Sequence, residues 1–190
     1  YTISTGLYYF YAHMFYAVDN LSDILQQRYY EKPLEVFDYI IVGAGTAGSV
    51  VASRLAEDSS LSVLVIEAGG RSSSLFDIPI TAPLLQLTPY DWQYKTEPQE
   101  NACLGLQDKV SLWPRGKILG GTSRLNYMMY LRGHPRDFDS WISDDCKHWT
   151  QDEIWTYFKI SENQKGIFSN RSEYHSTTGP IPVNDLRHSS

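Results

Sequence analysis

Cysteine is scarce in this sequence, which argues against a disulfide-rich or cysteine-ligated metal protein. The 190 residues hold two cysteines, Cys103 and Cys146, and their spacing matches no metal-binding motif. The five histidines do not cluster near them. We therefore predict no metal site, and the two cysteines remain either two thiols or one disulfide.

Basic residues are also in the minority, which bears on the kind of partner. The chain has 16 Lys and Arg residues against 22 Asp and Glu residues, giving a net charge of -6. Nucleic acids and anionic membranes bind basic surfaces, so we expect neither as a partner. The composition is 42% hydrophobic and 20% charged, which is typical of one globular domain with a core.

The apolar stretch at residues 7–18 is too short to span a bilayer, which needs about 20 apolar residues. It also lacks the basic start of a signal peptide, so we expect a packed helix or arm, with a degraded signal peptide as the alternative. Two N-x-S/T triplets begin at Asn20 and Asn170. These triplets either mark a protein secreted to the extracellular space or occur by chance, and the sequence does not choose between the two.

A strand, a glycine-rich turn, a helix and a second strand follow one another from residue 37. Residues 37–42 (FDYIIV) and 61–66 are short apolar runs, and residues 49–57 have helical apolar spacing. This order predicts a βαβ unit with parallel strands.

Three further segments carry local structural signals. We expect helices over 19–27 and 149–161, the latter capped by Thr150 with Glu153 three residues later. Three prolines between 69 and 94 predict an irregular, extended excursion. Residues 179–183 (GPIPV) read as an extended piece that enters structure beyond this sequence.

The turn of the βαβ unit carries the pattern G-x-G-x-x-G at Gly43, Gly45 and Gly48. Such glycines allow a tight turn, close approach of a pyrophosphate, and close packing of helix on strand. Backbone N–H groups at Thr46 and Ala47 would meet the phosphates at the positive end of the helix. The pattern predicts a dinucleotide site, and a glycine-rich turn without a ligand is the alternative.

Glu67 ends the second strand, 19 residues after Gly48. An acid at this place accepts hydrogen bonds from the ribose hydroxyls of an adenosine and repels a 2′-phosphate, which disfavours NADP. The unit itself does not choose between NAD and FAD, because both carry the ADP half that it binds.

A second glycine-rich block occupies residues 115–139. Arg115 and Lys117 add positive charge, while Thr122, Ser123 and Asn126 add hydroxyls and an amide. From these residues alone, a loop along an extended cofactor and a surface turn followed by a helix are both open.

This block resembles the first signature of the glucose–methanol–choline (GMC) oxidoreductase family, in its insect glucose-dehydrogenase-like branch. The resemblance covers residue 37 to the end. It rests on these segments: 38–48, 65–70 (VIEAGG), Asp91-Trp92, Thr96-Glu97-Pro98, 116–123 (GKILGGTS), Leu125-Asn126, Tyr130, Gly133, Asp139 and 149–162.

The resemblance implies an α/β fold, a Rossmann-like FAD-binding domain of GMC type that is incomplete here. It implies an N-terminal lead over 1–36, the FAD-binding domain over 37–179, and the start of a substrate domain over 180–190. The cofactor-binding residues that it implies are Gly43, Gly45, Thr46, Ala47, Gly48, Glu67, Ala68, Trp92, Leu119, Gly121, Thr122, Asn126 and Met128. Leu125 stands where some members attach FAD through a histidine, so we expect non-covalent FAD.

The activity implied by the resemblance is oxidation of a CH–OH group by hydride transfer to the flavin. The partners would be a small alcohol or sugar and an electron acceptor. The family's catalytic histidine belongs to a C-terminal motif, and none of the five histidines here lies in one: His13, His134, His148, His175 and His188. We read His134 as solvated and expect no catalytic residue in this chain.

We therefore expect a partial sequence that leaves apolar strand faces uncovered. Two alternatives remain: a truncated, non-catalytic homologue, and an NAD-dependent dehydrogenase, which would continue into regular βα units instead of a second glycine block.

Overall fold

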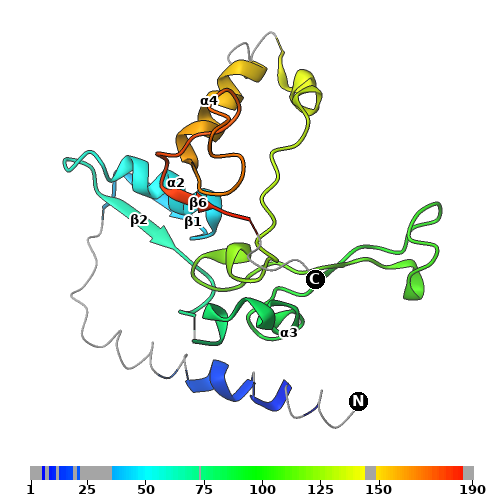
Figure 1. Cartoon of the computed structure of the whole chain (residues 1–190). Coiled ribbons are helices and arrows are strands. Elements are labelled where there is room, and N and C mark those ends of the chain that lie inside the picture. Colours follow the sequence, from blue (N-terminus) through cyan, green and yellow to red (C-terminus); the bar gives the residue numbers. More distant parts are fainter. Residues whose placement is uncertain are drawn as a thin grey trace. The chain divides into compact units, whose positions relative to one another are not determined.

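The computed structural model describes residues 6, 9–11, 13–18, 21, 36–72, 74–143 and 149–185 (Figure 1). The chain divides into two compact units, Tyr1–Met128 and Met129–Ser190. Outside the described residues lie Cys146, His148, His188 and all but residue 21 of the helix predicted at 19–27. Cys103 is a free thiol.

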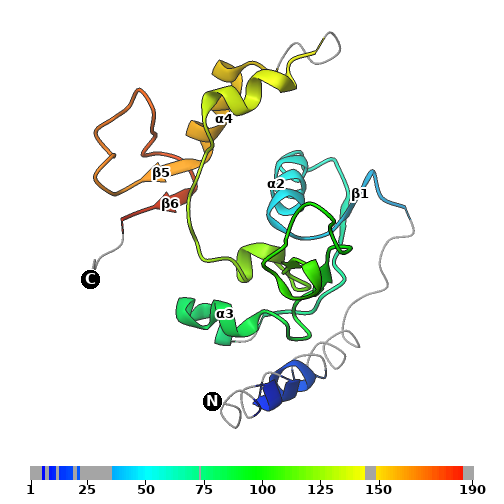
Figure 2. The same cartoon turned by 90° about the vertical axis from the view of Figure 1, so that its right-hand side faces the viewer.

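The predicted βαβ unit is present in the first unit. Strand β1 (Tyr39–Val42) leads into helix α2 (Thr46–Leu55), as Figure 2 shows. Strand β2 (Val63–Ile66), labelled in Figure 1, pairs parallel with β1. The register places Tyr39 opposite Val63 and Val42 opposite Ile66. The helix begins three residues earlier than predicted, because the end of the glycine-rich turn is already helical.

Apolar side chains on this unit are exposed, as expected. Parallel strands are normally buried on both faces, yet Val42 is 83% exposed and its neighbours are largely accessible. The exposed apolar residues of the two strands and the helix are Tyr39, Ile40, Val42, Val50, Val51, Val65 and Ile66.

The proline-rich segment after β2 is more compact than predicted. It forms short helical turns, η1 (Ser74–Asp77) and η2 (Pro79–Thr81), followed by α3 (Ala82–Leu85). The prediction of an extended course was wrong here, because proline also starts helices well. Pro79 and Pro83 each stand in the first turn of a helical element, where no intrahelical N–H bond is needed.

The hydrophobic core of the first unit lies outside the βαβ unit. It consists of Phe76, Leu85, Tyr90, Ile118 and Leu125, with Tyr16 and Leu75 packed against it. The Tyr90 ring meets Phe76 edge-on at 4.8 Å and Tyr16 at 5.1 Å. Tyr16 belongs to the helical residues 13–18, so the packed helix expected there is confirmed. The core therefore joins the turns at 75–90 to the second glycine block.

A buried carboxylate organises the segment that precedes the short strands β3 (Tyr94–Lys95) and β4 (Leu112–Trp113), which pair antiparallel. Asp91 is 3% exposed. Its carboxylate accepts hydrogen bonds from the backbone N–H groups of Leu87, Gln93 and Arg115 at 2.8–2.9 Å. One side chain thus fixes the loop around Trp92 and the entry to the second glycine block.

Replacing Asp91 by alanine is expected to destabilise the protein by about 2–3 kcal/mol. Three backbone N–H groups would lose their acceptor, and a buried donor without one costs about 1–3 kcal/mol. Urea unfolding of the full-length protein measures the change, with the exposed Glu100→Ala as control. Equal unfolding midpoints for the two variants would contradict this role of Asp91.

The second unit contains η5 (Pro135–Trp141), helix α4 (Gln151–Ser161) and strands β5 (Glu162–Gln164) and β6 (Ile181–Val183). The predicted cap of α4 is confirmed, because Thr150 and Glu153 form a reciprocal capping box. Strand β6 pairs parallel with β5, with Glu162 opposite Ile181. The extended C-terminal piece therefore pairs with β5 inside this chain, and its continuation into a further domain stays a prediction.

Glu162 is fully buried and is the polar centre of this unit. It pairs with the guanidinium of Arg132, accepts a hydrogen bond from Ser176 N at 3.0 Å, and lies 2.9 Å from His175 Nδ1. Burial by itself would raise the pKa of Glu162. The hydrogen bonds from His175 and Ser176 and the charge of Arg132 outweigh burial and hold this pKa below its usual value.

This lowered pKa predicts acid lability of the unit. Glu162 in the unfolded chain titrates near its ordinary value of about 4.3, so its stabilising effect is complete above that pH. The effect is lost as pH falls through the lower pKa of the folded state. Urea unfolding of the full-length protein between pH 7 and pH 3 should show a steeper loss for wild type than for Glu162→Gln. Parallel curves for the two proteins would refute the assignment.

Candidate dinucleotide-binding site

The two glycine-rich blocks meet through their backbones. Gly120 N donates a hydrogen bond to Ala44 O at 2.9 Å. A Cβ added at Gly121 would lie 2.7 Å from the Cα of Gly45, and Gly121 has a φ of +61°. Side chains are excluded from this junction, so two loops that are far apart in sequence form one surface.

The third glycine of the first motif lies where the helix crosses the strand. A Cβ at Gly48 would come within 1.9 Å of Gly43 O. This is the close approach of helix and strand that the motif predicts. It brings the start of α2 directly beside the turn.

The Glu67 side chain holds the first glycine-rich turn in place through hydrogen bonds. Its carboxylate accepts hydrogen bonds from Ala44 N at 2.7 Å and from Gly69 N at 3.0 Å. Each carboxylate oxygen can accept a further hydrogen bond, so both remain able to bind hydroxyl groups. The side chain is half-buried and faces the hollow between the loops.

This hollow, which we call the loop cleft, has a volume of about 580 Å³. Ten of the thirteen predicted cofactor-binding residues line it: Gly43, Gly45, Thr46, Ala47, Gly48, Glu67, Ala68, Trp92, Gly121 and Thr122. The other three do not. Asn126 and Met128 line a neighbouring hollow of about 270 Å³ beside Arg124, and Leu119 is exposed.

Several lining residues were not among the predicted binding residues. Tyr94 stacks on Trp92 with the ring centres 5.8 Å apart, and the two strand ends contribute Val42 and Ile66. The rule that ligands bind at the carboxyl ends of parallel strands would have found the strand ends. No local signal marks Tyr94, because its place depends on the pairing of β3 with β4.

Positive charge gathers at the loop cleft. Arg115 lines it, and Lys117 Nζ lies 4.8 Å from the centre of the Trp92 ring. Glu67 is the one acid in the lining. Basic groups, backbone N–H groups and one hydroxyl-binding acid fit the pyrophosphate and ribose of an ADP moiety.

The histidines of the described residues lie elsewhere. His134 is exposed, as expected, and its Nδ1 caps η5 by accepting a hydrogen bond from Arg136 N. His175 contacts Glu162, and neither these two nor His13 lines the loop cleft. Over the described ranges, no group of His, Cys, Asp or Glu could hold a metal ion. No helix in the described part is long and apolar enough to cross a membrane.

Comparison with known proteins decides the family. The model of the N-terminal region of GMC oxidoreductases matches residues 37–186. The chain belongs to the GMC oxidoreductase family. The resemblance expected from the second glycine block is thereby confirmed.

Sequence relatives of this GMC chain include insect enzymes. It is 42% identical over 156 residues to glucose dehydrogenase (FAD, quinone) of Drosophila melanogaster, covering 82% of this chain and 25% of that relative. It is 39% identical over 173 residues to ecdysone oxidase of Spodoptera littoralis, covering 85% and 28%. The chain thus spans about a quarter of the length of the curated relatives it matches.

Solved structures of the family share the fold. Pyridoxine 4-oxidase from Mesorbium loti superposes with a TM-score of 0.68 at 37% identity, over 77% of this chain and 28% of that one. A formate oxidase variant from Aspergillus oryzae gives a TM-score of 0.63 at 37% identity, over 78% and 26%. The expected α/β arrangement of a GMC cofactor domain is therefore present.

Proposed function

We propose that this GMC chain is the cofactor-binding part of an FAD-dependent oxidoreductase that oxidises CH–OH groups of an alcohol or sugar. The supporting observation is the backbone contact between Gly45 and Gly121, which builds one cleft from both glycine blocks beside Glu67. When bound, FAD supplies the hydride acceptor, and the chain supplies binding and orientation.

We assign a role to each part of the two glycine-rich blocks, and the lining of the loop cleft supports the assignment. The turn from Gly43 to Gly48 and the start of α2 bind the pyrophosphate through N–H groups, with Arg115 adding charge. Glu67 binds the adenosine ribose, and Ala68 and Trp92 flank it. Gly121 and Thr122, with the three residues outside the cleft (Leu119, Asn126 and Met128), lie on the flavin and ribityl side. The FAD-binding region runs over 37–179 and a substrate domain starts near 180.

The course of the chain after β2 favours FAD over NAD. A nicotinamide domain would continue into regular βα units, whereas this chain continues into 3-10 turns, the β3–β4 pair and the second glycine block. Names of relatives point the same way, since the Drosophila glucose dehydrogenase is named for FAD. A non-catalytic flavoprotein, the alternative that the sequence leaves open, is the second candidate.

Absorbance spectroscopy of the full-length protein tests this proposal. After desalting, flavin bands are expected, and anaerobic addition of an alcohol or sugar panel should bleach them. Flavin bands that no CH–OH donor bleaches would favour the non-catalytic candidate. A colourless, folded protein that binds NAD would overturn the FAD assignment.

The flavin is expected to be released intact by acid denaturation. Leu125 is 1% exposed in the core and offers no nucleophile for a covalent bond. Absorbance of the supernatant after precipitation measures release, and a covalently flavinylated oxidase serves as the control that retains its flavin. Flavin that stays with the precipitate and leaves only after proteolysis would contradict non-covalent binding.

We further propose that the protein is secreted. The triplets at Asn20 and Asn170 support this location, since such triplets are glycosylation acceptors in secreted proteins. Detection of the full-length protein in culture medium or in the cell extract tests it directly.

A further inference from the structure

The loop between β5 and β6 presents an asparagine in an exposed turn. Residues 168–172 read Phe-Ser-Asn-Arg-Ser, which places Asn170 at the start of an N-x-S triplet. Arg171 N donates a hydrogen bond to Phe168 O at 3.0 Å, so Asn170 is the third residue of a four-residue turn. Asn170 is exposed, and its side-chain amide makes no hydrogen bond to the described residues.

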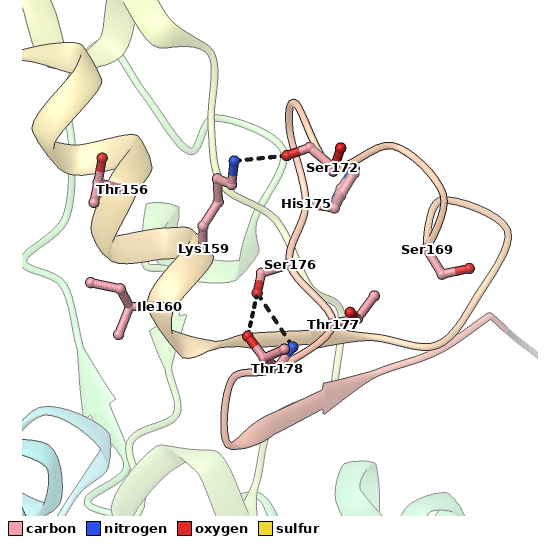
Figure 3. A pocket seen from close by; sticks show the side chains of 9 residues that line it. All are labelled: Thr156, Lys159, Ile160, Ser169, Ser172, His175, Ser176, Thr177 and Thr178. Atoms are coloured by element: carbon pink, nitrogen blue, oxygen red, sulfur yellow. Dashed lines mark hydrogen bonds between the residues drawn. The ribbon is translucent and has the colours of Figure 1, made fainter.

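The base of this loop is firmly held. Lys159 Nζ, from α4, donates hydrogen bonds to Ser172 O at 2.7 Å and Glu173 O at 3.3 Å. His175 pairs with the buried Glu162 behind it. Figure 3 shows Lys159 reaching from α4 to Ser172, while Ser169 lies on the outer part of the loop away from α4. Asn170 is therefore exposed to solvent in a turn whose base is held by hydrogen bonds.

An aromatic ring stands two residues before the asparagine. Phe168 stacks on His175 with the ring centres 5.6 Å apart and an interplanar angle of 14°. The exposed Arg171 lies with its guanidinium 5.6 Å from the Phe168 ring centre. The ring nevertheless remains 39% exposed. The exposed part of this ring lies two residues from Asn170 and can support the C–H face of a sugar that takes the place of the Arg171 guanidinium.

We propose that Asn170 carries an N-linked glycan whose first N-acetylglucosamine packs against Phe168. In the transfer, Asn170 Nδ2 loses a proton and bonds to C1 of the sugar on a lipid-linked oligosaccharide diphosphate. The bond from C1 to the diphosphate oxygen breaks, and the lipid diphosphate leaves. This inference rests on the proposed secretion, because the donor and its transferase act in the secretory pathway.

Site occupancy is the first test. The full-length protein, carrying Asn20→Gln, is expressed in eukaryotic cells both as encoded and with an added secretion signal. Peptide mass spectrometry and a glycosidase-sensitive gel shift should show a glycan on Asn170 in both cases. Asn170→Gln and Ser172→Ala should remove the Asn170 glycopeptide and reduce the gel shift by one glycan. Ser172→Thr should keep both signals, and Asn101→Gln, at an exposed asparagine outside any triplet, should leave them unchanged.

Comparing the protein as encoded with the protein that carries an added secretion signal tests the glycan on Asn170 separately from the proposed secretion. An unmodified Asn170 in protein that is secreted by the added signal overturns the glycan inference. A different outcome is that the protein as encoded stays in the cell without a glycan, while the protein with the added signal is glycosylated. That outcome overturns the proposed secretion, and with it the proposal that Asn170 is glycosylated when the protein carries no added signal.

The contact with Phe168 has its own test. Enzymatic removal of the glycan should lower the Tm of wild type and of Phe168→Tyr, but leave the Tm of Phe168→Ala unchanged. Loss of the His175 stack in Phe168→Ala lowers the Tm of both glycan forms alike, so the difference between the forms isolates the sugar contact. An equal drop in all three proteins overturns the packing of the sugar on Phe168.

Discussion

Gly48→Ala is expected to weaken FAD binding by the full-length protein, with an affinity loss of about 10- to 100-fold. The added Cβ would stand 1.9 Å from Gly43 O, which is part of the backbone and cannot rotate away as a side chain could. The start of α2 would have to move off the strand, carrying with it the N–H groups around Thr46. Overpacking costs about 1–3 kcal/mol and occasionally more, and each 1.4 kcal/mol is tenfold in affinity.

A matched substitution serves as control for this effect. Gly105 has no atom within 4 Å of an added Cβ and no positive φ, so Gly105→Ala should keep its flavin. Flavin content per protein after desalting, together with titration of the flavin-free protein by fluorescence quenching, measures both variants. Wild-type affinity in Gly48→Ala would show that the turn is not where the pyrophosphate binds.

Glu162→Ala is expected to lower the free energy of unfolding by about 3–5 kcal/mol. Removing one partner of a buried ion pair leaves the other charge buried without compensation. Here the charge left behind is Arg132, whose side chain is 8% exposed. Its guanidinium also lies over the rings of Tyr130, Trp155 and Phe158, so it is closely surrounded by aromatic side chains.

Two comparisons isolate the buried charge as the cause. Glu173→Ala removes an exposed carboxylate from the loop between β5 and β6 and should change the free energy of unfolding little. The double variant Arg132→Met with Glu162→Leu removes both charges and should recover much of the loss, because apolar replacements of a buried pair are often neutral or stabilising. Urea unfolding measures all three, and a double variant as unstable as Glu162→Ala would count against this account.

The sequence predicts the local parts of this fold well and the long-range parts poorly. The runs around Ile41 and Val65 and the glycines between them mark β1, α2 and β2, because a βαβ unit is signalled within about thirty residues. Strand β5 reads Glu-Asn-Gln and has no apolar alternation, so nothing in the sequence indicates it. It is a strand because β6 pairs with it.

The same distinction applies to the site. The glycine spacing and Glu67 predict the adenosine half, since their roles depend on neighbours in the motif. The contact of Gly45 with Gly121 joins residues that are far apart in sequence. The family resemblance implied that both bind one cofactor, but nothing in the sequence predicted their contact. Asp91 and Glu162 look like surface acids in the sequence, because burial of a carboxylate depends on partners brought by other segments.

The hydrogen bonds that the Glu67 carboxylate accepts bear on how the cofactor binds. This carboxylate accepts hydrogen bonds from Ala44 N and Gly69 N, and Gly120 N donates one to Ala44 O, so the loops are held by contacts within the chain. A site that is already ordered loses little conformational entropy on binding. We therefore expect the flavin to dock into ordered loops without folding them, so that affinity differences among variants of the loop cleft arise mainly from the rate at which the cofactor dissociates.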